Sequence, residues 1–290
     1  MSEVVLGGLD VPAKAAGRRR PRLPVLTVAA LFFLLAVVVL AVFGRIVAPY
    51  DPSTIDFAAV HAAPSGAHWL GTDQLGRDVL SRLLVGARPA LWGPALIALG
   101  AMFLGNILGL LAGFFGGLTD SLIMRATDAA YAFPGLLIAI VVSGILGSSY
   151  LVSIAILTVL FTPEDIRIVR AATLAQRHLP YVEAARTLGL SAPRIMLRHI
   201  WPNVLPLTVA QIFLTFARAL VALAALAFLG IGVDLTVPTW GLMLADGKSI
   251  VLVSPAAALA PAVMIVLTAV SMNLLGDWSF EQLSERGRTR

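Results

Sequence analysis

Residues 181–203 read YVEAARTLGLSAPRIMLRHIWPN and form a polar, basic stretch between two long apolar ones. Pro180 is typical of the first turn of a helix, and Gly189 of the position just beyond a helix end. Ser191 can cap a second short helix, which we expect to end at the Trp-Pro pair of residues 201–202. The stretch is therefore predicted to form a helix, a tight turn and a second helix, a shape suited to docking onto another protein.

The side chains of this stretch also favour a docking surface. A water-facing surface would not expose Ile195, Leu197 and Trp201 together without a partner to cover them. Ala184 and Ala185 are small enough to let the surface of another protein come close. We therefore expect these side chains to face a partner rather than to carry out covalent chemistry.

The whole chain is far more apolar than a soluble domain. Of its 290 residues, 59% are hydrophobic and 13% are charged, whereas soluble domains carry roughly 25% charged residues. This surplus of apolar side chains cannot fit into one water-soluble core, so we expect an all-α, polytopic membrane protein. The chain has no cysteine and only four scattered histidines, so neither a catalytic thiol nor a metal site is expected.

Length and hydropathy predict six membrane spans. The uncharged residues 25–43, at about 1.5 Å per residue, are close to the thickness of the hydrocarbon core. We expect the third span to break at Pro134, and the short fourth span to be followed by a separate amphipathic helix over residues 163–178. The predicted spans are residues 25–43, 90–115, 121–146, 148–162, 204–229 and 254–275.

Two patterns concern how the spans pack. Gly105, Gly109 and Gly113 recur at every fourth residue of the second span, and this spacing lets another helix approach closely in lipid. Arg125 and Asp128 lie three residues apart at the start of the third span, so they share one helix face. We expect these two charges to neutralise each other or a neighbouring charge.

The distribution of positive charge predicts the orientation. Lys and Arg are concentrated in the two terminal segments and in residues 163–203, and they are sparse in residues 44–89 and 230–253. Because positive charge favours the cytoplasmic side, we predict that both termini and the docking stretch are cytoplasmic. The predicted units are a cytoplasmic tail (1–24), a first span with an external amphipathic segment (25–86), a five-helix core that includes residues 163–203 (87–276) and a second cytoplasmic tail (277–290).

The external segment before the second span has its own pattern. Residues 68–88 read HWLGTDQLGRDVLSRLLVGAR, which is typical of a turn followed by an amphipathic helix. Leu75, Val79, Leu83 and Leu84 would share one face of that helix. We predict that it lies on the membrane surface, before the second span begins, with a substrate site as the open alternative.

Several motifs resemble those of ABC importer permeases. Glu183-Ala184-Ala185, then Gly189 after three residues, then Trp201-Pro202, resemble the coupling motif of that family. Other segments resemble one branch, the second membrane subunit of dipeptide, oligopeptide and nickel importers, and the likeness runs from about residue 25 to residue 280. These segments are residues 71–82, 114–117, 132–134, 228–232, 238–241 and 273–277.

This resemblance implies a MetI-like permease fold and a role in transport of di- or oligopeptides, with nickel–chelator complexes and glutathione as open alternatives. It implies a partner permease, two cytoplasmic ATPase subunits that bind ATP and Mg, an extracytoplasmic binding protein and the bacterial inner membrane. No catalytic residue, cofactor or nucleic acid is implied for this chain. By position, the coupling residues would be Glu183, Ala184, Ala185, Arg186, Gly189 and Pro202.

The chain departs from the pattern of that branch at three positions. Trp201 stands where a leucine is usual, Leu223 where a glutamate is usual, and Arg218 where a small residue is usual. A charge at membrane depth is costly, so Arg218 is a candidate functional residue. Two hypotheses remain open for it: it faces the translocation path and binds a ligand carboxylate, or it forms a structural pair with the partner permease.

Other function classes fit the sequence less well. Gly247-Lys248-Ser249 resembles the end of a phosphate-binding loop, but Leu242 stands where the first glycine belongs. A DNA-binding helix-turn-helix over residues 180–201 is disfavoured, because its second helix would present mostly apolar side chains to DNA. A secondary transporter driven by ions remains the main rival, although we find no matching second half for the break at Pro134.

Overall fold

The computed structural model describes residues 25–147, 149–234 and 236–288, with side chains described as far as Leu283. Within these ranges the chain contains helices and no β-strand, and one isolated bridge joins Thr72 to Asp78. The helices are α1 (Val25–Val47), η1 (Phe57–Ala59), α2 (Val79–Phe115), α3 (Gly117–Tyr131), α4 (Gly135–Leu146), α5 (Tyr150–Gln176), α6 (Pro180–Thr187), α7 (Ala192–Ile195), η2 (Met196–Ile200), α8 (Trp201–Phe228), α9 (Trp240–Lys248) and α10 (Pro255–Arg288).

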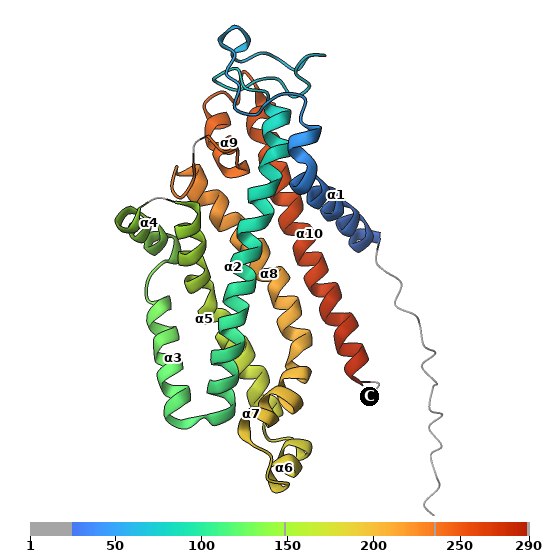
Figure 1. Ribbon diagram of the computed structural model, residues 1–290, viewed down its shortest axis with the longest axis vertical. Helices are drawn as coiled ribbons and strands as arrows, with labels where there is room; N and C mark the ends of the chain where they lie inside the picture. Colours follow the sequence, from blue (N-terminus) through green and yellow to red (C-terminus); the bar gives the residue numbers. More distant parts are fainter. Residues whose placement is uncertain (1–24, 148, 235, 289–290) are drawn as a thin grey trace, which may run out of the picture.

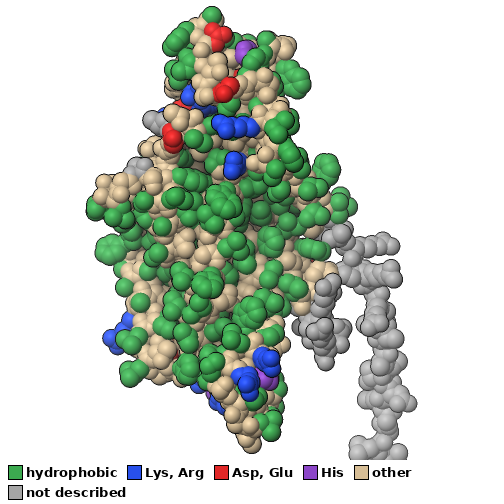
Figure 2. Space-filling model, in the orientation of Figure 1, with side chains coloured by type: hydrophobic (Ala, Val, Ile, Leu, Met, Phe, Trp, Pro, Cys, Tyr) green, Lys and Arg blue, Asp and Glu red, His purple; other side chains and the backbone are tan. Residues whose placement is uncertain are grey.

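The long helices run side by side and form an elongated bundle (Figure 1). Figure 2 shows apolar side chains over the middle of the bundle and charged side chains gathered towards its two ends. In the described part of the chain, four helices are long and apolar enough to cross a membrane, and a fifth crossing is possible if α3 and α4 count as one bent span. The protein is therefore an all-α, polytopic membrane protein.

The expected fourth span, residues 148–162, lies within α5, which is long enough to cross a membrane but carries four charged residues. Three of them pair with other helices: Glu164 with Arg218 of α8, Arg167 with Asp128 of α3, and Arg170 with Asp120 of α3. The fourth, Asp165, is completely buried, and its Oδ1 accepts a 3.4 Å hydrogen bond from Thr215 of α8. Because its charges have partners within the bundle, α5 is compatible with the six-span architecture.

The small residues of α2 set its close contact with α5, as their spacing predicts. A Cβ atom placed on Gly105 would lie 2.5 Å from the Cβ of Asp165, and one on Gly113 would lie 2.6 Å from the Cβ of Thr173. Only glycine therefore allows this helix pair to pack at its observed separation.

Two predicted boundaries at prolines are wrong. The turn expected within residues 68–88 forms, but the helix after it is not separate from the second span: it begins at Val79, capped by Asp78, and continues through Pro89 to Phe115 as α2. Likewise the fourth span and the amphipathic helix over residues 163–178 form one helix, α5, which continues through Pro163. A packed membrane bundle tolerates the hydrogen bond that a proline removes, because neighbouring groups satisfy the freed carbonyls.

The break at Pro134 is confirmed. α3 and α4 meet there at an angle of 83°. Asp128 pairs with Arg167 of α5 at 2.6 Å rather than with Arg125, so the expected neutralisation of Asp128 comes from a neighbouring helix. The last predicted span, residues 254–275, lies within α10, which extends beyond it to Arg288.

The loop before α2 folds into a compact cap that is tied to α9 by buried ion pairs. Arg77 contacts Asp73 at 2.7 Å and Asp246 at 3.0 Å. Arg82, which is only 3% exposed, contacts the same two carboxylates at 3.6 and 3.2 Å. Leu75 lies in this cap and not on a helix. The motif over residues 71–82 thus joins the loop, α2 and α9 at the end of the bundle opposite α6 (Figure 1).

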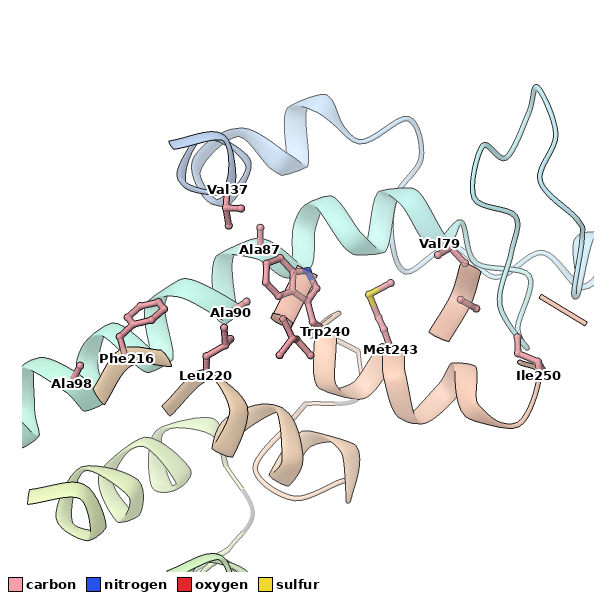
Figure 3. Close-up of a cluster of buried hydrophobic side chains, with 12 residues drawn as sticks. Val37, Val79, Ala87, Ala90, Ala98, Phe216, Leu220, Trp240, Met243 and Ile250 are labelled. Atoms are coloured by element: carbon pink, nitrogen blue, oxygen red, sulfur yellow. The ribbon is translucent and has the colours of Figure 1, made fainter. Parts of the chain in front are cut away.

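Trp240 anchors α9 in the bundle core (Figure 3). It is almost completely buried, its Nε1 donates a 3.0 Å hydrogen bond to the carbonyl of Leu83, and its ring lies over Gly86 of α2. Around it pack buried side chains from α1, α2 and α8, including Val37, Ala90 and Leu220. The core therefore holds the capped end of the bundle together.

Candidate functional site

The first part of the docking stretch forms as predicted. Pro180 occupies the first turn of α6, which ends at Thr187. Gly189 has φ +74° and donates a 2.9 Å hydrogen bond to the carbonyl of Arg186, so it closes the helix as the left-handed residue beyond its end. Ser191 precedes α7, but its side chain makes no capping hydrogen bond.

The apolar residues of the docking stretch divide between an inner and an outer face. Val182, Ala185 and Ile195 are buried in a cluster with the ends of α2, α5 and α8. Two of these, Ala185 and Ile195, were expected on the partner-facing surface, and that expectation is wrong because they fill the contact between α6 and the bundle. Ala184 is exposed, as expected, and lies next to Leu188, whose side chain is 80% exposed.

Leu188 belongs to the outer face although the sequence reading did not single it out. It lies four residues after Ala184, so both side chains project from one side of α6. Its position just before Gly189 was the available signal, since an apolar residue at the end of a short, exposed helix is available to a partner. Leu197 of η2 is also exposed.

The polar residues of the segment hold it to the bundle. The guanidinium of Arg186 lies over the ring of Phe114 at 5.3 Å, although its side chain remains exposed. The hydroxyl of Tyr181 donates a 2.6 Å hydrogen bond to Gln176 of α5 and accepts one of 3.2 Å from Asn203 of α8. Burial raises the pKa of the Tyr181 phenol. These contacts connect α6 to both α5 and α8.

Glu183 is exposed on α6 and has no ion pair within the described part of the chain. Pro202 is exposed in the first turn of α8. Both residues are therefore exposed, and no described contact assigns them a partner.

The predicted end of the second short helix at residues 201–202 is wrong. α7 passes through one turn of π-helix, η2, directly into α8, and the backbone N–H of Trp201 bonds to the carbonyl of Met196. A wider turn of this kind accommodates Pro202, which cannot donate a backbone hydrogen bond. The part of the docking stretch that begins at Ala192 is consequently the start of the long helix that also carries Arg218.

Arg218 lies on α8 and pairs within its own chain. Its Nη1 donates to Oε2 of Glu164, and its Nη2 donates a 3.1 Å hydrogen bond to Oγ1 of Thr215. The ring of Phe161 lies 5.5 Å from the guanidinium carbon. The partner of Arg218 is thus a residue of α5 that the sequence reading missed, and only an acidic residue at membrane depth could have signalled it.

Comparison with known proteins gives consistent matches. Residues 105–288 match the family described as binding-protein-dependent transport system inner membrane component. The chain is 38% identical to the glutathione transport system permease protein GsiD of Pectobacterium atrosepticum over 251 residues, which cover 86% of this chain and 83% of that protein. The protein of the same name from Escherichia coli O6:K15:H31 is 38% identical over 260 residues, covering 89% and 86%.

A solved structure of the MetNI methionine ABC transporter in an inward facing conformation has a similar fold. Its TM-score is 0.55, and the match covers 70% of this chain and 96% of that chain at 17% identity. The expected MetI-like fold is therefore confirmed.

Proposed function

Because the chain belongs to the family of binding-protein-dependent transport system inner membrane components, we propose that it is the permease of an ATP-driven importer for small peptides, glutathione among them. The identity to glutathione transport permeases over most of both chains is the observation that carries this proposal. Small peptides and glutathione share free carboxylates, a free amine and amide bonds, so one translocation path can serve both.

The proposal includes the partners and the orientation that the sequence predicts. A second permease subunit would pair with this chain in the bacterial inner membrane, two ATPase subunits would bind its cytoplasmic end, and a binding protein would deliver the ligand outside. The cytoplasmic end is the one that carries α6 and α7, because Arg186, Arg194 and Arg198 lie there. The cap over residues 48–78 would then face the binding protein.

The coupling contact is proposed to consist of the outer face of α6 and the residues beside it. Ala184 permits close approach and Leu188 supplies an apolar side chain for a pocket on the ATPase. Glu183 and Arg186 offer one charge of each sign at the edge of this face, and Pro202 lies at the start of α8. Since Tyr181 of α6 accepts a hydrogen bond from Asn203 of α8, and α6 packs in one buried cluster with α7, η2 and α8, a displacement of α6 by the ATPase would move α8.

Transport by the complete complex in proteoliposomes tests the proposed function. We would supply binding protein and ATP and measure uptake of labelled glutathione, a dipeptide and a nickel–chelator complex. The proposal requires ATP-dependent uptake of glutathione or the dipeptide that persists when the proton gradient is collapsed. Uptake driven by an ion gradient without ATP would establish a secondary transporter, and uptake of the nickel complex alone would overturn the peptide assignment.

A further inference from the structure

Glu164 and Arg218 are opposite charges placed far from the ends of two long helices. Each lies more than two turns from either end of its helix, α5 or α8. They pair with each other, yet 37% of the Arg218 side chain and 39% of the Glu164 side chain remain exposed. The pair therefore lies on an open face of the chain and not in its core.

Within membrane spans, charged side chains face the bundle interior, another protein or a water-filled cavity rather than lipid. A single charged side chain at the centre of a membrane helix costs about 2.5–3.5 kcal/mol even by the most permissive measure, so such residues face protein or a water-filled cavity. By contrast, Val159 on the same helix α5 is 63% exposed and apolar, as a lipid-facing residue should be. The face with Glu164 and Arg218 is therefore one that encloses water or meets another protein.

The guanidinium of Arg218 is positioned by its neighbours but retains free donors. Thr215 accepts one hydrogen bond from it, and Thr215 itself bonds to the buried carboxylate of Asp165. The ring of Phe161 supports the guanidinium from one side. Of the five N–H donors that an arginine carries, one bonds to Glu164 and one to Thr215, and the buried Nε–H has no hydrogen-bond partner in the described part of the chain.

We propose that this pair is a transit site for the charged ends of the transported peptide, with Arg218 binding a carboxylate and Glu164 binding the amine. This inference rests on the proposed function, since it names the substrate groups recognised on the path. A peptide-like ligand carries both charges, so it can replace one internal ion pair by two pairs with the protein. Neither Glu164 nor Arg218 is then left without a partner, whether the site is empty or occupied.

Exchange of ion-pair partners also gives the site the moderate affinity for ligand that transport needs. Because the empty site is already satisfied by the internal pair, a ligand gains only the difference between the new and the old contacts. A translocation site must bind well enough to admit the ligand and weakly enough to release it. A lone arginine on the path would instead hold a carboxylate tightly and would be costly when empty.

The absence of cysteine from this chain allows a direct test. The Phe161→Cys variant, assembled with its partner subunits in detergent and without nucleotide, would be treated with a cysteine-containing tripeptide whose thiol is activated as a pyridyl disulfide. Exchange would attach the peptide to the introduced thiol and release pyridinethione, and the mass of this chain would report the rate. Val159→Cys on the same helix is the matched control.

We expect the free tripeptide to label Phe161→Cys about tenfold faster than Val159→Cys, the factor associated with one charge-assisted contact. Amidation of the peptide carboxylate should remove this advantage, as should Arg218→Gln, while N-acetylation and Glu164→Gln should remove the contribution of the amine. Arg218→Lys keeps the positive charge but loses the planar guanidinium with its paired donors, so its labelling rate should fall between the rates with arginine and with glutamine at this position. Because the binding protein is left out, blocked peptides reach the site regardless of its selectivity.

The outcomes separate this inference from the proposed function. Equal labelling of both positions, or rates unaffected by the blocking groups and by Arg218→Gln, would show that the pair is structural, even if the complex imports peptides. If the complex imports no peptide at all, the proposed function fails first, and the transit site fails with it. Co-purification of the partner subunits with each variant confirms that assembly is intact.

Discussion

Substitution of Gly189 provides the sharpest test of the coupling segment. Its φ is +74°, and a Cβ atom at this position would meet no atom within 4 Å. Gly189→Ala therefore introduces backbone strain and no clash. The left-handed conformation costs a residue with a side chain about 1–2 kcal/mol, which corresponds to a factor of roughly 5–30 between the native turn and a relaxed one.

Gly230 is a matched control at the other end of the same helix system. It follows α8, has φ +75° and is equally free of neighbours within 4 Å of a Cβ atom. We expect Gly189→Ala and Gly230→Ala to lower the melting temperature of the complex by similar amounts. Only Gly189→Ala should reduce the ATPase activity stimulated by the liganded binding protein, by at least about fivefold given the strain above.

Gly189→Asn should retain most of the stimulated activity that Gly189→Ala loses, because asparagine adopts the left-handed conformation more readily than alanine. The assay is ATP hydrolysis by the reconstituted complex with and without the binding protein and ligand. If Gly189→Ala is stimulated normally, or if Gly230→Ala loses as much stimulation, the turn between α6 and α7 does not transmit the motion and the coupling role must be abandoned.

Three further predictions follow from the packing. Asp246→Ala removes one of the two carboxylates that contact the buried guanidinium of Arg82, so we expect a loss of about 3 kcal/mol in unfolding free energy. Asp128→Ala removes an exposed ion pair and should cost less than about 1 kcal/mol. Thermal unfolding of the two variants measures both effects. Gly105→Ala places a methyl group 2.5 Å from α5 and should reduce the yield of folded, monodisperse protein. Leu188→Ser removes an exposed apolar side chain, so it should weaken co-purification of the ATPase subunits while the melting temperature of the isolated chain is unchanged.

The sequence predicts the helices of this protein better than it predicts where they end. The apolar helices predicted from hydropathy and the break at Pro134 are confirmed by the structure, and so is the close approach of α5 to the glycines of α2. The errors fall at Pro89, Pro163 and Pro202, each of which was taken as a boundary and lies inside a continuous helix. A proline removes only one backbone donor, and whether a helix survives that loss depends on neighbours that are distant in sequence.

At one of these prolines, the hydroxyl of Tyr150 at the start of α5 donates a 2.5 Å hydrogen bond to the carbonyl of Pro89, a contact that the order of residues does not reveal. The same limitation affects the docking stretch. Residue type alone does not show that Ala185 and Ile195 face inward while Leu188 faces outward, because that division depends on which side of α6 meets the ends of α2 and α8. The turn at Gly189, by contrast, depends only on local backbone chemistry and was predictable.

The continuity from α7 through α8 connects two features that the sequence presents as separate. The second half of the docking stretch begins this helix at Ala192, and Arg218 lies well along it, paired with Glu164 of α5. The hydrogen bonds of Tyr181 tie α6 to both α5 and α8 at their docking ends. A movement of α6 by an ATPase would therefore act on the same two helices whose relative position sets the distance between Arg218 and Glu164. If the pair is a transit site for the ligand, ATP-driven motion of α6 would open and close that site through these hydrogen bonds and through the continuous helix from α7 to α8.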